Sequence, residues 1–173
     1  MRSLLAIVAV ALALGLGAQT AHADGLGVGD RAPELDIAKD AKGRAFKLKS
    51  RKGKWMLLTF GAKWCAPCAK ELPAWDTLAA RYAGRIEFVA VNINNEPKDG
   101  KKFFDKLKIK KMTRVFLPAN KSAVDDLYET GTFPSSFIVD PTGLVRYVHR
   151  GFDGGSVAEM TAKLDQLLPA RRK

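Results

Sequence analysis

The sequence predicts an α/β domain in which a central mixed β-sheet is flanked by helices. Two nearly continuous apolar runs, 55–60 and 85–93, have the pattern of strands buried on both faces. The segment between them, 66–82, has helical periodicity, and such a strand–helix–strand unit implies a right-handed crossover and a parallel pair. Two alternating segments, 135–140 and 144–150, flank the turn residues Pro-Thr-Gly and add an antiparallel hairpin.

The remaining elements complete this sheet and its helices. Residues 33–50 predict an N-terminal β-hairpin, because Lys-Asp-Ala-Lys-Gly is a turn and the apolar Phe46 and Leu48 alternate with polar residues after it. We also expect a helix over 97–108, a strand over 113–119, a short helix over 122–128 and a closing helix over 156–168. The apolar face of the closing helix is expected to comprise Val157, Met160, Leu164 and Leu167.

The first 23 residues have the features of a secretory signal peptide. Arg2 supplies a short positive region, residues 4–16 are an apolar run, and Ala-His-Ala at 21–23 has the small-residue pattern of a cleavage site. The apolar run is shorter than the roughly 20 residues that span a bilayer, which favours a cleaved signal over an uncleaved membrane anchor. We therefore expect 1–23 to be removed and 24–173 to form one domain in an oxidising compartment, periplasmic or secreted.

The chain is strongly basic, with a formal net charge of +11. Its positive residues are concentrated in 39–54, 98–114 and 171–173. An exported protein rarely meets nucleic acid, so we expect no nucleic-acid partner. A basic surface of this kind favours acidic protein partners or a weak contact with an anionic membrane surface. A solvated basic surface without a specific partner is the third alternative.

The stretch Trp-Cys-Ala-Pro-Cys at 64–68 contains both cysteines of the chain. As a structural staple, the pair would close a loop of only a few residues and would constrain the unfolded chain little. As a zinc site it supplies two of four ligands, and His149 is the only histidine outside the signal segment. A working redox couple is therefore the favoured interpretation. A Cu(I) carrier that uses both thiolates is the alternative from a different functional class.

The position of the pair distinguishes its two sulfurs. The first turn of a helix favours a thiolate through its unpaired N–H groups and partial positive charge, to which Lys63 and Lys70 would add if they lie close. Cys65 is expected at the exposed lip before the helix, where it would be the attacking nucleophile. Cys68 would be the buried resolving thiol, because it begins the core-facing stripe that continues through Leu72, Trp75, Ala79 and Tyr82.

These residues resemble the active site of the thioredoxin superfamily. The resemblance rests on Gly-Ala-Lys-Trp-Cys-Ala-Pro-Cys at 61–68, on Pro73 inside the following helix, and on Phe133-Pro134 before a later strand. It implies a thioredoxin-like fold in which Pro134 is a cis-proline that faces a redox-active Cys65–Cys68 disulfide. It implies neither a cofactor nor a resident metal. The substrate-binding surface that it implies comprises Trp64, Thr132 and Phe133.

The export signal, the N-terminal hairpin and an extra helix between Val91 and Pro134 narrow the resemblance to the TlpA/ResA type of periplasmic or membrane-attached thiol–disulfide oxidoreductase. Members of this type reduce disulfides in exported proteins, notably apocytochromes c before haem attachment and copper-site assembly factors. The resemblance thus implies such substrates, together with a membrane thiol donor of the DsbD/CcdA kind, and we expect a monomer. A disulfide-donating oxidase is the alternative within the enzyme class, because the sequence does not set the direction of electron flow.

Two positions bear on how protons would be handled. Thioredoxin itself has a buried aspartate on the strand before the motif, and Thr59, which cannot ionise, stands there in this chain. ResA-type proteins instead have a glutamate three residues after the second cysteine, and Glu71 occupies that place. The resemblance implies that Glu71 raises the thiol pKa values or relays a proton. An ordinary exposed carboxylate beside Lys70 is the alternative.

Overall fold

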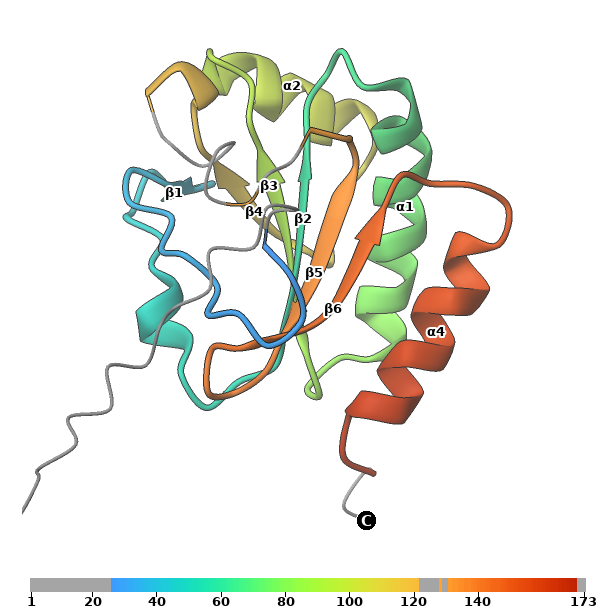
Figure 1. Ribbon diagram of the computed structural model, residues 1–173. Helices are drawn as coiled ribbons and strands as arrows, with labels where there is room; N and C mark the ends of the chain where they lie inside the picture. Colours follow the sequence, from blue (N-terminus) through green and yellow to red (C-terminus); the bar gives the residue numbers. More distant parts are fainter. Residues whose placement is uncertain (1–25, 122–127, 129–130, 171–173) are drawn as a thin grey trace, which may run out of the picture.

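The computed structural model describes residues 26–121, 128 and 131–170, so the expected signal peptide lies outside the described residues, as does the helix expected over 122–128 apart from Tyr128. One mixed sheet organises the fold. Its strands are β1 Lys39–Asp40, β2 Met56–Gly61, β3 Glu87–Asn92, β4 Thr113–Phe116, β5 Ser135–Val139 and β6 Val145–Arg150. Their order across the sheet is β1-β4-β3-β2-β5-β6 (Figure 1). The pairs β2–β3 and β3–β4 are parallel, and the other neighbouring strands are antiparallel.

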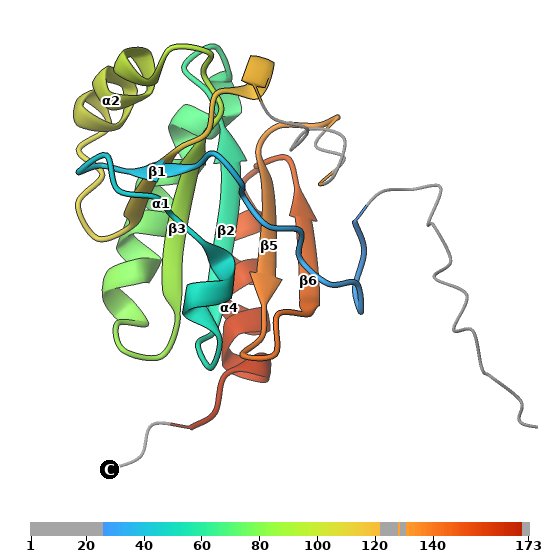
Figure 2. The ribbon, with the colours of Figure 1, turned by 90° about the vertical axis from the view of Figure 1, so that its left-hand side faces the viewer.

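The helices are distributed unequally around this sheet. They are α1 Ala66–Arg81, α2 Pro97–Lys106 and α4 Ser156–Leu167, with short 3-10 helices at Leu48–Arg51 and Ala119–Lys121. Figure 1 shows α1 and α4 side by side against one face, which we call the helix face. Figure 2 shows the segment 26–54 crossing the opposite face, which we call the N-terminal face. Both faces are therefore covered, as the apolar strand patterns indicate.

Alternation along β2 divides its side chains between the two faces. Leu57 packs in the cluster that α1 and α4 complete, and Thr59 on the same side bonds to α1. Met56, Leu58 and Phe60 pack in the second cluster, with apolar residues of the segment 26–54. The central strand thus supports a separate core on each side.

The predicted fold class is confirmed. The pair β2–β3 is parallel and is joined by α1, and β5 and β6 form the C-terminal hairpin. The extra helix expected between Val91 and Pro134 is present as α2. The core-facing stripe of α1 is also correct, because all five of its residues are buried: Cys68, Leu72, Trp75, Ala79 and Tyr82.

The N-terminal hairpin is much shorter than predicted. A bridge between Lys39 and Ala45 and backbone hydrogen bonds from Asp40 N to Arg44 O and from Phe46 N to Ala38 O join its two arms near the turn, and β1 also pairs with β4. A 3-10 helix begins at Leu48 where a strand was expected, because the Glu34 carboxylate accepts hydrogen bonds from the backbone N–H groups at positions 48 and 49. The segment serves as a cover for the sheet rather than as two paired strands.

Two smaller predictions about helices are also wrong. The helix expected over 97–108 ends at Lys106, and Lys108 has a positive φ of 55° that no continuing helix allows. Val157 was placed on the apolar face of the closing helix but is 38% exposed, whereas Met160 and Leu164 are fully buried. Within the part of the chain that the structure describes, no helix has the length and apolar character needed to cross a bilayer.

Candidate active site

The two cysteines form a disulfide at the N-terminus of α1. The S–S distance between Cys65 and Cys68 is 2.02 Å. Cys65 is the N-cap of the helix, and its Sγ accepts a hydrogen bond of 3.1 Å from Cys68 N. Pro67 lies in the first turn, where its missing N–H leaves no helical bond unmade. The helix terminus therefore directs an N–H group at the sulfur that is expected to carry the negative charge.

The two sulfurs are buried to different degrees, but less differently than predicted. Cys68 has no exposed surface, whereas Cys65 is 5% exposed and so is itself buried rather than at an exposed lip. The reason is that Cys65 turns inward as the N-cap and is drawn toward Cys68 by the closed disulfide. The predicted order is nevertheless kept, and only Cys65 retains access to a partner.

Gly61, the last residue of β2, leaves room for the disulfide. A Cβ atom at this position would lie 2.9 Å from Cys68 Sγ and 3.1 Å from Cys68 Cβ. Real Cβ contacts are essentially never as short as 2.9 Å, so a residue with a Cβ atom at this position would displace the sulfur. Gly61 belongs to the stretch that carried the resemblance, but the sequence alone did not assign it this role.

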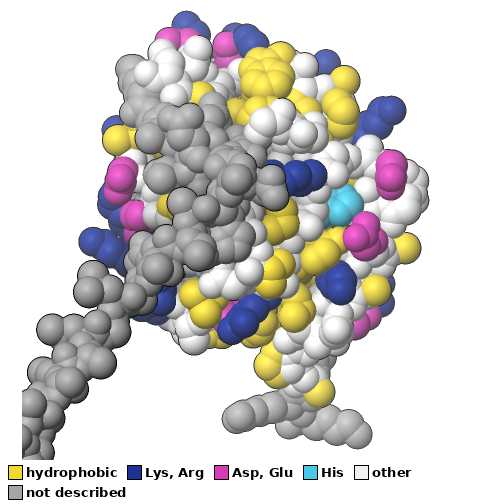
Figure 3. All heavy atoms as spheres, viewed as in Figure 1, with side chains coloured by type: hydrophobic (Ala, Val, Ile, Leu, Met, Phe, Trp, Pro, Cys, Tyr) yellow, Lys and Arg dark blue, Asp and Glu magenta, His cyan; other side chains and the backbone are white. Residues whose placement is uncertain are grey.

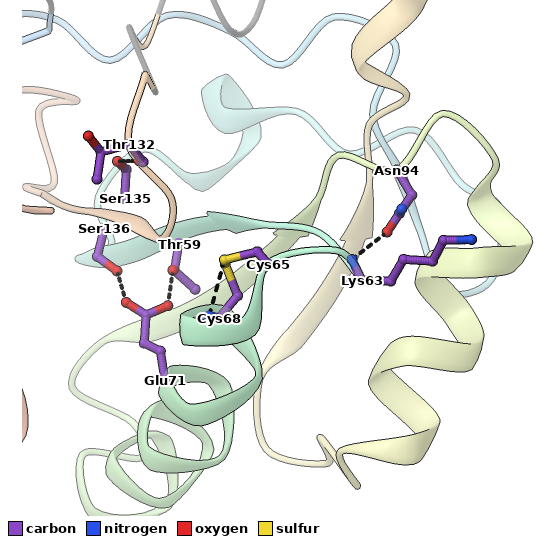
Figure 4. Close-up of a disulfide and its surroundings, with 9 residues drawn as sticks. All are labelled: Thr59, Lys63, Cys65, Cys68, Glu71, Asn94, Thr132, Ser135 and Ser136. Atoms are coloured by element: carbon purple, nitrogen blue, oxygen red, sulfur yellow. Dashed lines mark hydrogen bonds between the residues drawn. A yellow bond between two sulfur atoms is a disulfide. The ribbon is translucent and has the colours of Figure 1, made fainter. Parts of the chain in front are cut away.

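Lys63 is turned away from the disulfide. Figure 4 shows its side chain on the far side of the loop, and its Nζ pairs with Asp99 of α2. The hydrogen bond from Lys63 lowers the pKa of Asp99. The expected contribution of Lys63 to thiolate stability is therefore largely cancelled by this ion pair. The backbone N–H of Lys63 also donates to Asn94 Oδ1 at 3.0 Å, a brace for the loop that sequence reasoning missed.

Glu71 is buried, and the alternative of an exposed carboxylate is wrong. Its side chain is only 1% exposed and lies on the helix face beneath the disulfide (Figure 4). Thr59 Oγ1 donates to Oε2 at 2.7 Å, and Ser136 Oγ donates to Oε1 at 3.0 Å. Trp75 Nε1 in turn donates to Ser136 Oγ at 3.1 Å. These partners lie on α1 and on two neighbouring strands, β2 and β5.

Burial raises the pKa of Glu71 to about 7, while the hydrogen bonds from Thr59 and Ser136 act in the opposite direction. A carboxyl group with such a pKa exchanges its proton near neutral pH. Thr59 was noted above only because it cannot ionise, and here it donates a hydrogen bond to the carboxyl group of Glu71 on α1. Ser136 was missed, and serine at the start of a strand carries no signal for this role.

The second half of the site comes from the start of β5. The Phe133–Pro134 peptide bond is cis, as expected. Trp64 is 61% exposed, and its ring meets that of Phe133 edge-on, with 5.3 Å between the centroids. Thr132 is exposed, and its carbonyl oxygen accepts a hydrogen bond from Ser135 Oγ. The two motifs found in the sequence therefore meet at one end of the sheet.

The polar groups of this region are engaged with one another. Among the described residues, no three His, Cys, Asp or Glu side chains gather as a metal-binding group would require. The two sulfurs are joined to one another, and Glu71 is engaged with hydroxyl groups. The arrangement is suited to the exchange of a disulfide.

Comparison with known proteins agrees with this geometry. The AhpC/TSA family model matches residues 28–148. The thioredoxin-like protein YneN of Bacillus subtilis is 32% identical over 141 residues, which cover 82% of this chain and 81% of that protein. The thiol-disulfide oxidoreductase ResA of Geobacillus thermodenitrificans is 29% identical over 125 residues, or 72% of this chain and 70% of ResA.

Solved structures show the same similarity. A protein from Chlorobium tepidum described as a thiol:disulfide interchange protein DsbE superposes with a TM-score of 0.74 at 29% identity, covering 82% of this chain and 98% of that one. The structure titled MTB dsbF, in its mixed oxidised and reduced forms, gives 0.66 at 27% identity, with 79% and 95% covered. With the buried disulfide at a helix N-terminus and the cis-proline beside it, these findings show that the chain belongs to the AhpC/TSA family and is a thiol–disulfide oxidoreductase of the TlpA/ResA type.

Proposed function

We propose that this protein is exported and reduces disulfides in exported partner proteins. The Cys65 thiolate attacks one sulfur of the partner's disulfide, so a Cys65–partner bond forms and the partner's other sulfur leaves as a thiolate. The Cys68 thiolate then attacks the Cys65 sulfur, which closes the Cys65–Cys68 disulfide and releases the second partner thiolate. Two electrons pass to the partner in each cycle. A membrane thiol donor of the DsbD/CcdA kind returns them.

The observation that carries this proposal is the unequal burial of two bonded sulfurs at a helix N-terminus. Cys68 is inaccessible, so an external disulfide can meet only Cys65. The N–H of Cys68 already points at Cys65 Sγ and would stabilise the thiolate there after reduction. Nucleophile and resolving thiol are thus assigned by access and by hydrogen bonding.

Glu71 handles the proton in this cycle. It lies one helical turn beyond Cys68, and its pKa of about 7 lets it give up or accept a proton near neutral pH. When Glu71 is ionised, its negative charge beneath the sulfurs disfavours a thiolate at Cys68 and raises the pKa of that thiol. Cys68 then keeps its proton until the mixed disulfide has formed.

The substrate polypeptide binds against the surface formed by Trp64, Thr132, Phe133 and Pro134. The exposed Trp64 ring and the half-buried Phe133 ring offer an apolar contact beside Cys65. An extended segment that carries a disulfide can lie along the backbone before β5. Apocytochromes c and copper-site assembly factors are candidate substrates, and we expect the protein to act as a monomer with at most weak contact to an anionic membrane surface.

The reduction potential of the Cys65–Cys68 pair in the domain 24–173 tests the direction of the reaction. Equilibration against thiol redox buffers should give a value near or below about −250 mV, which suits a reductase with a dedicated donor. A value above about −180 mV would show a donor of disulfides instead.

Two single variants test the assigned roles. Cys65→Ser should abolish reduction of insulin, whereas Cys68→Ser should accumulate a mixed disulfide with the substrate that non-reducing electrophoresis detects. If Cys65→Ser accumulates the mixed disulfide instead, Cys68 is the nucleophile and Cys65 is the resolving thiol. If wild type binds Cu(I) stoichiometrically and has no reductase activity, the protein is a metal carrier rather than an enzyme.

A further inference from the structure

A dense group of lysines lies on and just after α2. We call it the α2 lysine surface, and it comprises Lys98, Lys101, Lys102, Lys106, Lys108, Lys110 and Lys111. All seven side chains are exposed. Within α2 they occupy spacings of three and four opposite the buried Phe103 and Phe104, so they project together on the solvent side.

The nearby acids neutralise this surface only in part, because they are hydrogen-bonded to other groups, although Lys98 and Lys102 also lower the pKa of Asp99 after the larger effect of Lys63. Asp99 pairs with Lys63, and Asp105 Oδ1 pairs with Arg114 at 2.7 Å. Asp76 Oδ1 accepts the backbone N–H groups of residues 110–112 at 3.0, 2.6 and 3.0 Å. Among the described residues, no salt bridge involves the seven lysines. Glu96, just before α2, is the one exposed carboxylate beside them without such a partner.

The start of α2 lies close to the redox site, whereas Lys111 lines a pocket with Lys54 near the start of β2. Lys63 pairs with Asp99 of α2. Lys63 is also only two residues from Cys65, so the Cα atoms of Lys63 and Cys65 are at most about 7 Å apart. Figure 1 places α2 at the same end of the sheet as the loop that precedes α1. In the same orientation, Figure 3 shows hydrophobic side chains at that end, with Lys and Arg side chains and some Asp and Glu side chains beside them. A partner that approaches Cys65 therefore meets the field of these lysines.

We propose that the α2 lysine surface docks an acidic segment of the partner protein whose disulfide is exchanged at Cys65. The proposal rests on the proposed function and specifies its substrate class, namely polypeptides with Asp or Glu residues near the reactive disulfide. Like-signed exposed charges on one helix face raise the local concentration of an oppositely charged chain and speed its association.

The position of the surface favours a polypeptide over a membrane as its occupant. Lys63 ties the surface to the loop that carries the exposed Trp64 and leads to Cys65. A bilayer on the α2 lysine surface would therefore lie against the opening through which a protein disulfide must reach Cys65. A polypeptide that binds the same lysines brings its own disulfide to that opening.

The test compares two disulfide peptides of equal length, one flanked by aspartates and one flanked by asparagines. The measured quantity is the ratio of their kcat/KM values, acidic over neutral. In wild type at low ionic strength this ratio should be roughly ten or more. It should approach one in about 1 M salt, where the Debye length is about 3 Å.

A matched pair of triple variants locates the effect. K98E/K101E/K102E should lower the ratio at least roughly tenfold, because it reverses the field beside Cys65. K49E/K52E/K54E changes the net charge equally at exposed positions around the start of β2, the opposite end of that strand from the disulfide. Lys54 lies near Lys111 there but away from α2 and Cys65, so this variant should leave the ratio within about twofold. Circular dichroism verifies folding, and the milder K98Q/K101Q/K102Q should give an intermediate ratio.

Three outcomes would overturn the inference. Equal effects of both triple variants would mean that only net charge matters. A wild-type ratio near one would remove the acidic preference. Loss of binding to vesicles of equimolar phosphatidylcholine and phosphatidylserine, with an unchanged peptide ratio in K98E/K101E/K102E, would assign the surface to membranes. In each case turnover of the neutral peptide leaves the proposed function intact, whereas a wild type that reduces neither peptide contradicts that function and this inference together.

Discussion

The two faces of the sheet are both buried, yet they differ in what they bury. On the N-terminal face, the centre of the sheet is apolar and aromatic, with Leu58, Phe60 and Phe137 packed together. On the helix face, the neighbouring positions of the same strands are Thr59 and Ser136, which hold the carboxyl group of Glu71. Alternation along two strands thus separates a face that stabilises the fold from a face that carries chemistry.

This contrast shows how a buried acid can be tolerated in a small domain. Each carboxylate oxygen of Glu71 has a hydroxyl donor, and the Trp75 indole N–H donates to one of those hydroxyl groups. A buried polar group without such partners would cost several kcal/mol. The network keeps Glu71 ionisable near neutral pH without opening the core to water.

The largest loss of stability is expected from the apolar face. Phe60→Ala removes a ring that lies 4.7 Å from Tyr128 and 5.8 Å from Phe137, measured between centroids. It should lower the free energy of unfolding by about 3–5 kcal/mol in a denaturant titration. The reduction potential should stay unchanged, because the ring points away from the sulfurs. If Phe60→Ala shifts the reduction potential as much as a variant on the helix face does, the two faces do not have separate roles.

Glu71→Gln sharpens the comparison on the helix face through its pH dependence. Burial raises the pKa of Glu71 from 4.5 to about 7, so the neutral form is favoured in the folded state. The resulting advantage of the folded state is complete below pH 4.5 and is lost as the pH rises to about 7. Over this window wild type should lose about 3 kcal/mol relative to the glutamine variant.

The oxidised protein is the form to measure, because its cysteines do not titrate. Unfolding free energies of wild type and Glu71→Gln between pH 4 and 8 give the difference directly. Glu96→Gln changes an exposed carboxylate and is the control: its unfolding free energy should vary with pH in parallel with that of wild type. Parallel curves for Glu71→Gln as well would show that the buried carboxyl does not titrate in this range.

Of these three substitutions, Gly61→Ala should have the smallest effect on stability, and the size of that effect should depend on the redox state of the cysteines. The added Cβ would lie 2.9 Å from Cys68 Sγ, so the oxidised form should lose about 1–3 kcal/mol in unfolding experiments. The reduced form should lose less, because a free Cys68 side chain can rotate away. Gly154→Ala, where nothing lies within 4 Å of the new Cβ, is the matched control. Equal losses in both forms would place the strain in the backbone rather than at the sulfur.

Continuous apolar runs and helical periodicity were the parts of the fold that the sequence predicted well. The apolar runs gave β2 and β3, the periodicity gave the buried stripe of α1, and each has the expected place. The cover on the N-terminal face was read as a hairpin because Phe46 and Leu48 alternate as in a strand. Both residues are indeed buried, but a distant carboxylate, Glu34, turns the backbone into a 3-10 helix at that point.

The candidate site was predictable only as far as local motifs reach. The cysteines, Trp64 and Phe133-Pro134 lie in short stretches whose residue order is informative by itself. The burial of Glu71 depends on partners 12 and 65 residues away in the chain, so no local pattern could decide it. The same holds for Asn94, which braces the backbone N–H of Lys63 from 31 residues away.

The antiparallel pairing of β2 with β5 sets the two halves of the site side by side. Phe60 is in register with Ser135, so the end of one strand meets the beginning of the other whatever the chain does between them. From Ile93 the chain leaves the sheet centre and forms α2 and then β4, which lies between β3 and β1, and at Pro134 it is again at the same two-strand junction. Insertions or deletions in that excursion can change what surrounds the disulfide without moving Pro134 relative to Cys65. One fixed junction can thereby be fitted with different substrate-recognition surfaces.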